Sequence, residues 1–145
     1  QRAFKFVRKD FIKAPQNIDT YKVFIPESNG SGALGEILST PLIGAPLVGH
    51  TQTFISIGDF KTKAEAEACL KYIKTKFSRV LLGVLKLTQH NPSPIWAKVP
   101  LQDFTNNSDI DWTQSVADID RQLYQKYDLS PEEIVFIETH VKEMD

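Results

Sequence analysis

The segment from Thr62 to His90, TKAEAEACLKYIKTKFSRVLLGVLKLTQH, constrains the fold most because it predicts one long amphipathic helix. The Thr62 hydroxyl can cap the free amides of the first turn while Glu65, three residues on, reaches back to the cap amide, which is a capping-box pattern. Apolar residues at spacings of three and four would then share one face: Ala66, Cys69, Leu70, Ile73, Phe77, Val80, Leu81, Val84 and Leu87. We therefore expect a helix from Thr62 to about Gln89.

The length of this helix is unusual for a chain of 145 residues, which is otherwise expected to form one domain. At about 1.5 Å per residue the segment would exceed about 35 Å, which is long for a small domain. We therefore expect a break or bend, either between Thr75 and Ser78 or at Gly83.

Shorter segments before and after the helix have the character of strands. Residues 1–13 predict an edge strand or an entering segment with one cationic side, and residues 21–25 predict a strand closed by Pro26. Residues 51–57 predict a strand inside the sheet, since both faces carry apolar residues near its end. Pro41 and Pro46 make residues 37–48 an irregular connector, and residues 96–101 would add a short last strand. These elements predict an α+β fold with a small mixed or antiparallel sheet packed on the long helix.

Two short helices are expected in the C-terminal part of the chain. Asp111, Thr113 or Ser115 can cap the first, whose apolar positions are Val116, Ile119, Leu123 and Tyr127. The second begins at Ser130-Pro131-Glu132-Glu133, which supplies a cap, a proline at the first position and a glutamate at the third.

Charge divides the chain into two parts despite a net charge of -1. Residues 1–100 contain 14 Lys and Arg against 7 Asp and Glu, whereas residues 101–145 contain 3 against 11. We interpret residues 1–104 as a basic α/β body suited to a polyanion, and residues 105–145 as an acidic helical tail. The tail either packs on the body or docks against a basic partner.

Signatures of catalysis are scarce, so we expect no enzyme activity, metal or cofactor in this fragment. The single cysteine, Cys69, lies on the apolar helix face, and the three histidines have no metal-ligand spacing. Asp59-Phe60-Lys61 has the acid-x-Lys spacing of a metal-dependent nuclease, but Asp is also a routine turn residue there. Serine-hydrolase and nucleotide-loop motifs are absent. The chain has no membrane-spanning apolar run and, with one cysteine, no possible internal disulfide, so it is expected to be soluble and cytoplasmic.

The sequence has more residues suited to DNA binding than residues arranged for catalysis. Lys76, Arg79 and Lys86 would form a cationic stripe along the helix beside a phosphate backbone, with Gly83 allowing close approach. Further cations and polar loop residues would extend this surface or approach base edges: Lys5, Arg8, Lys9, Lys22, Ser28, Asn29, Thr51, Gln52 and His90. A basic stripe is also common on an ordinary solvated helix face, so the residue types alone do not establish binding.

Several stretches together resemble a known family: YKVFIPESNGSGALGE, EAEACLKYIKTKFSRVLLGVLKLTQHNP, VPLQDFT, SDIDW and IDRQLYQKYDLSPEEIVFIETHVKEMD. They are similar to the C-terminal region of bacterial restriction-modification proteins, in which an adenine-specific DNA methyltransferase is fused to or associated with a restriction endonuclease. The likeness spans nearly the whole chain. No base-reading residue is carried over from it.

The resemblance implies a target-recognition module that positions double-stranded DNA for methylation or cleavage by another domain. The chain would then be a fragment, and S-adenosylmethionine and magnesium would belong to the parent protein. A second interpretation is a non-catalytic docking domain that joins restriction-modification subunits through the acidic tail. A third, a nuclease using Asp59 and Lys61, would cleave DNA by itself.

Overall fold

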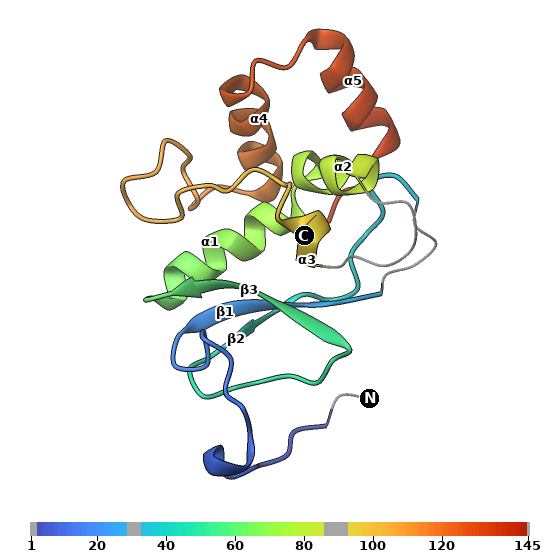
Figure 1. Cartoon of the computed structure of the whole chain (residues 1–145). Helices are drawn as coiled ribbons and strands as arrows, with labels where there is room; N and C mark the ends of the chain where they lie inside the picture. The colour runs from blue at the N-terminus through green and yellow to red at the C-terminus, as the bar shows by residue number, and fades with distance from the viewer. Residues whose placement is uncertain (1–2, 29–32, 86–92, 145) are drawn as a thin grey trace.

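The computed structural model describes residues 3–28, 33–85 and 93–144, and Figure 1 shows how their helices and strands are arranged. In chain order the elements are η1 (Lys9–Phe11), β1 (Tyr21–Pro26), β2 (Leu42–Gly44), β3 (Phe54–Phe60), α1 (Lys63–Lys74), α2 (Lys76–Leu85), α3 (Ser93–Trp96), α4 (Val116–Lys126) and α5 (Pro131–His140). The α+β expectation is confirmed, since a three-stranded antiparallel sheet lies below the helices.

The sheet has the order β2-β1-β3, with Val23 of β1 opposite Ile43 on one side and Ile57 on the other. β1 is central because it pairs with both other strands, and four of its six residues are buried, whereas no residue of β3 is fully buried. The prediction that residues 51–57 lie inside the sheet was therefore wrong, because β3 is an edge strand. β2 is a short edge strand within the predicted connector.

Two other segments form no strand. For residues 1–13, predicted as an edge strand or an entering segment, the strand does not form: residues 3–8 pair with no described strand, Arg8 has an extended backbone, and the 3-10 turn η1 follows. Residues 96–101 contain the end of α3 and a turn in place of a strand. Both segments carry apolar residues, but neither pairs with β2 or β3, the two edge strands of the sheet.

The expected single long helix is divided into α1 and α2 at Thr75, within the interval where the length argument placed a break. Thr75 leaves the helical conformation at ψ 148°. Its Oγ1 donates to the Tyr72 carbonyl at 2.6 Å and accepts from the Ser78 amide at 3.1 Å, so one side chain ends α1 and starts α2. At the start of α1, Thr62 caps the Glu65 amide as predicted, but Glu65 accepts from the Lys61 amide.

Gly83 of α2 lies close to the backbone of another segment, at Leu34 and Gly35. A Cβ atom at this position would lie 2.9 Å from Leu34 Cδ1 and 3.0 Å from the Gly35 amide nitrogen. The close approach attributed to a phosphate backbone is thus used by the loop at residues 33–36, which runs beside α2.

The acidic tail packs on the basic body. Ser115 caps α4, and Ser130 and Glu133 form the predicted capping box of α5. Ile119 and Leu123 of α4 are fully buried in the same apolar cluster as Val23 and Ile73 of the body. The two parts that differ in charge therefore share one hydrophobic core.

Cys69 lies in this core with 2% of its surface exposed, and burial raises the pKa of its thiol to about 12. A thiol with so high a pKa is almost wholly protonated at neutral pH, which suits a packing role. Within the described residues, no helix has both the length and the apolar character needed to span a membrane.

Candidate functional site

The twelve residues predicted to contact DNA fall into three groups. Lys5, Arg8, Lys9, Ser28, Thr51 and Gln52 are exposed. Lys22, Lys76 and Arg79 are buried. Asn29, Lys86 and His90 lie outside the described residues. The structure therefore divides a surface that the sequence analysis treated as continuous.

Lys22 is 1% exposed and serves the fold of the sheet. Its Nζ donates to the carbonyl oxygens of Ile18, Thr20 and Ala45 at 3.0 to 3.1 Å, which uses all three ammonium protons. Desolvation lowers the pKa of Lys22, and attraction to Asp19 opposes this shift. As placed, Lys22 ties β1 to the segments before it and after β2 and has no free proton for a phosphate.

Arg79 is also buried, with 1% of its surface exposed. Its Nη1 donates to the Gly35 carbonyl at 2.8 Å, its Nη2 to the Lys142 carbonyl at 2.5 Å and its Nε to the Lys74 carbonyl at 3.0 Å. Desolvation lowers the pKa of Arg79, although nearby Asp120 raises it. The guanidinium thus joins three segments that are distant in sequence.

Lys76 is 8% exposed, and its Nζ lies 2.5 Å from Glu138 Oε2 of α5. Tyr124 of α4 donates to the other oxygen of Glu138 at 2.8 Å. Burial acts to raise the pKa of Glu138, but these two partners outweigh it and the pKa is lowered. The expectation of an exposed stripe through Lys76 and Arg79 is therefore corrected, because both cations face acceptors from the tail.

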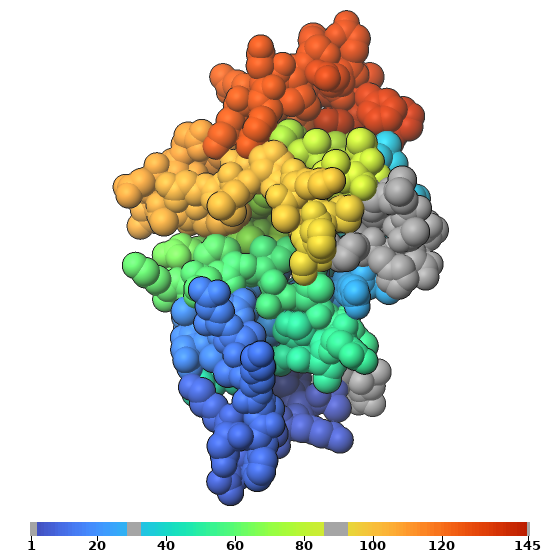
Figure 2. All heavy atoms as spheres, viewed as in Figure 1, coloured from blue at the N-terminus to red at the C-terminus, as the bar shows by residue number. Residues whose placement is uncertain are grey.

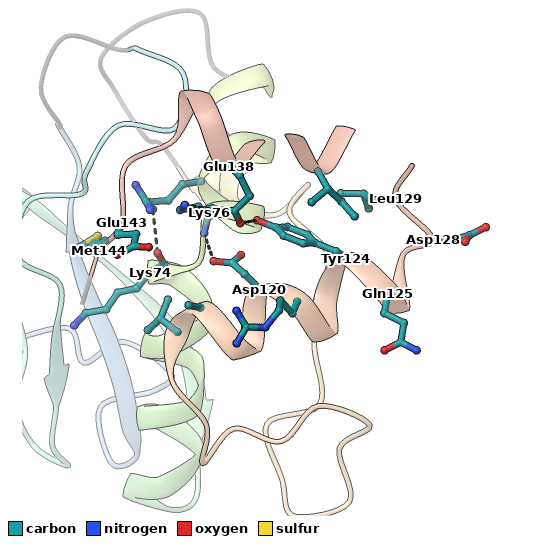
Figure 3. A pocket seen from close by; sticks show the side chains of 15 residues that line it. Lys74, Lys76, Asp120, Tyr124, Gln125, Asp128, Leu129, Glu138, Glu143 and Met144 are labelled. Atoms are coloured by element: carbon teal, nitrogen blue, oxygen red, sulfur yellow. Dashed lines mark hydrogen bonds and ion pairs between the residues drawn. The ribbon is translucent and has the colours of Figure 1, made fainter. Parts of the chain in front are cut away.

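Asp120 is the buried acid that sequence reasoning missed. Its two carboxylate oxygens accept from the backbone amides of Lys76 and Phe77, each at 2.9 Å, and so cap the start of α2 from another helix. Figure 3 shows Asp120 pointing from α4 toward these amides, with Lys76 and Tyr124 meeting at Glu138. The available signal was an acid between Ile119 and Leu123, on the apolar side of a predicted helix.

These residues line a cavity of about 610 Å³ between α2, α4 and α5. Four of its charged groups, Lys76, Arg79, Asp120 and Glu138, already bind one another or backbone atoms at the distances given above. We interpret the cavity as the junction between body and tail. Elsewhere in the described part of the chain, no group of three His, Cys, Asp or Glu side chains is placed to hold a metal ion.

The exposed polar residues gather at one end of the sheet. Glu27, Ser28, Gln52, Thr53 and Ile55 line a surface hollow of about 770 Å³ where β1 ends and β3 begins. The Glu27 amide donates to the Thr53 carbonyl at 3.1 Å, which holds the two loops together. Two of the predicted base-reading residues, Ser28 and Gln52, thus come from separate loops to one site.

The exposed cations lie on an N-terminal arm, which we define as residues 3–13. It carries Lys5, Arg8, Lys9 and Lys13 against one acid, Asp10, and every residue is exposed. Arg8 pairs with Asp10 at 2.7 Å, and Lys9 lies 3.3 Å from Asp19. In Figure 1 the arm runs below the sheet, at the same end of the molecule as the loop before β3.

Comparison of the chain with models of protein families, with curated proteins and with solved structures finds no match. What the molecule does must therefore be argued from its own residues and their arrangement.

Proposed function

We propose that the chain is a DNA-recognition module that positions duplex DNA for methylation or cleavage by another domain. The observation that supports this most is the exposed cationic arm at the same end of the molecule as the polar hollow at Ser28 and Gln52. The family resemblance of the sequence points the same way. In such a module the arm would supply affinity and the hollow would supply selectivity.

The arm is suited to contacts with phosphates. Its four cations act on one short segment, and three of their charges are not cancelled by the single acid of that segment. The pairs that Arg8 and Lys9 form are exposed, so they cost little to exchange for phosphate oxygens. Cationic arms of this kind are a common supplement to a folded DNA-binding domain.

The hollow is suited to contacts with bases. Ser28 offers a hydroxyl group and Gln52 offers an amide, and both can donate to or accept from base edges. Since these two side chains come from loops held together by a backbone hydrogen bond, their spacing is set by the sheet and does not depend on a ligand.

Salt-dependent DNA binding tests this function. We expect Lys5→Ala/Lys9→Ala/Lys13→Ala to weaken duplex binding at least about tenfold and to make the slope of log affinity against log salt shallower by about two to three. A matched control, Lys61→Ala/Lys63→Ala/Lys98→Ala, removes equal charge from exposed positions outside the arm and should change little. The proposal is wrong if arm and control variants bind alike, as fluorescence anisotropy would show.

A second candidate function, protein docking, is favoured by a different property of the arm. Phe4, Phe6 and Phe11 are exposed by 86%, 106% and 74%. Aromatic side chains this exposed and this close in sequence are typical of a segment that binds another surface. In an extended segment, Phe4 and Phe6 lie on one side and Lys5 on the other. Docking through the two phenylalanines and DNA contact through Lys5 would therefore use opposite sides of the arm.

A further inference from the structure

Helix α5 carries large apolar side chains that stay exposed, although the Phe136 ring stacks on His140 with ring centroids 4.3 Å apart. Glu132, Val135, Phe136 and Thr139 are spaced by three and four residues and share one side of the helix, which we call the α5 outer face. Val135 is 60% exposed and Phe136 45%, whereas Ile137 on the inner side is 5% exposed. An outer face with two large apolar side chains is unusual for a helix that already packs through its other side.

The surroundings of the α5 outer face are acidic. Glu132 and Glu133 are both exposed in the first turn of α5. Glu133 accepts from the Ser130 amide in the capping box, but no described cation pairs with Glu132. The face therefore offers apolar contact next to unneutralised negative charge.

The N-terminal arm has the complementary character. Phe4 and Phe6 supply aromatic surface, and Arg8 follows them on the same side of an extended segment. Phe4 and Phe6 can cover Val135 and Phe136 while Arg8 approaches Glu132, exchanging its exposed pair with Asp10. Both surfaces belong to this chain, and each lacks what the other provides.

The two surfaces cannot meet within one copy as it is folded, because the arm and α5 lie at opposite ends of the molecule (Figure 2). We propose that the arm of one copy docks on the α5 outer face of a second copy. This contact is heterologous, since different surfaces meet, and each bound copy still presents a free arm or a free outer face. Association is therefore head to tail, and it is weak because the contact involves few side chains.

Sedimentation velocity of the whole chain without DNA tests the proposal. We expect the mean mass to rise with concentration for the unaltered chain. Phe4→Ser/Phe6→Ser and Val135→Ser/Phe136→Ser should each stay monomeric, and their exposed positions make loss of the fold improbable. Val84→Ser/Leu101→Ser, which replaces exposed apolar residues elsewhere, is the matched control and should still associate.

Mixing the two monomeric variants is the decisive measurement. Each retains one competent surface, so the mixture should form a one-to-one dimer that does not grow further. The proposal is overturned if the unaltered chain stays monomeric at all concentrations, if either variant still associates alone, or if the mixture forms no dimer.

As a second route, Arg8→Glu and Glu132→Arg should each weaken association and together restore it. Since Phe4 and Phe6 face away from Lys5, the serine variants should keep their DNA affinity, which separates failure of this proposal from failure of the DNA-binding function.

Discussion

Asp120 is the residue on which the junction between body and tail depends. Its carboxylate is 2% exposed, and the cost of desolvation raises its pKa to about 6 although two backbone amides bind it. The buried Arg79 also lowers this pKa without restoring the ordinary value of 3.8. The folded protein therefore favours the protonated form of Asp120 more than the unfolded chain does.

The raised pKa predicts a pH-dependent stability with a definite sign. The contribution of Asp120 is complete below the unfolded pKa of 3.8 and is lost as pH rises through about 6. The free energy of unfolding of the unaltered chain, relative to Asp120→Asn, should thus fall by on the order of 3 kcal/mol between about pH 4 and pH 7. Urea unfolding of both proteins across this range measures the difference. Parallel pH profiles would contradict the prediction.

At the scale of elements, the break between α1 and α2 shows what the sequence predicted correctly and what it did not. The apolar periodicity predicted the helical residues, and the length of the run predicted a break. The prediction of an exposed cationic stripe failed at Lys76 and Arg79, although both lie in the one helix α2, because the side of α2 that carries them is covered by other segments of the chain. The acceptors that bury Lys76 and Arg79 also come from residues 35, 138 and 142. No local pattern predicts contacts between segments so distant in sequence.

Thr75 should be costly to replace at this break, because its hydroxyl group serves both helices. Thr75→Val keeps the shape of the side chain but leaves the Ser78 amide without its acceptor, so we expect a loss of about 1 to 3 kcal/mol in the free energy of unfolding. Thr75→Ser keeps the hydroxyl and removes one methyl group, which should cost about 1 kcal/mol. Chemical denaturation compares the two. Equal losses would mean that packing, and not hydrogen bonding, holds the break.

For the molecule as a whole, the charge distribution predicts a basic body and an acidic tail, whereas the structure shows that the two parts pack around one core. Opposite net charge is a property of composition, whereas the shared core depends on Ile119, Leu123 and Ile137 meeting the outer side of α1 and α2. The sequence predicted the two tail helices with their caps. Their docking depends on contacts between distant segments, such as those of Lys76 with Glu138 and of Arg79 with the Lys142 carbonyl, which no local sequence pattern predicts.

A shared core predicts that the chain unfolds as one unit and that residues 1–104 do not fold alone. Removing residues 105–145 would expose the apolar surface that α4 covers and would remove the acceptors that Glu138 and the Lys142 carbonyl give to Lys76 and Arg79. We expect one calorimetric transition for the full chain and none for residues 1–104. Deleting residues 1–13 is the matched control, since every described residue in that segment is exposed, and should leave the transition nearly unchanged. A cooperative transition in the 1–104 fragment would show that the body has a core of its own and that the tail is an attachment to it.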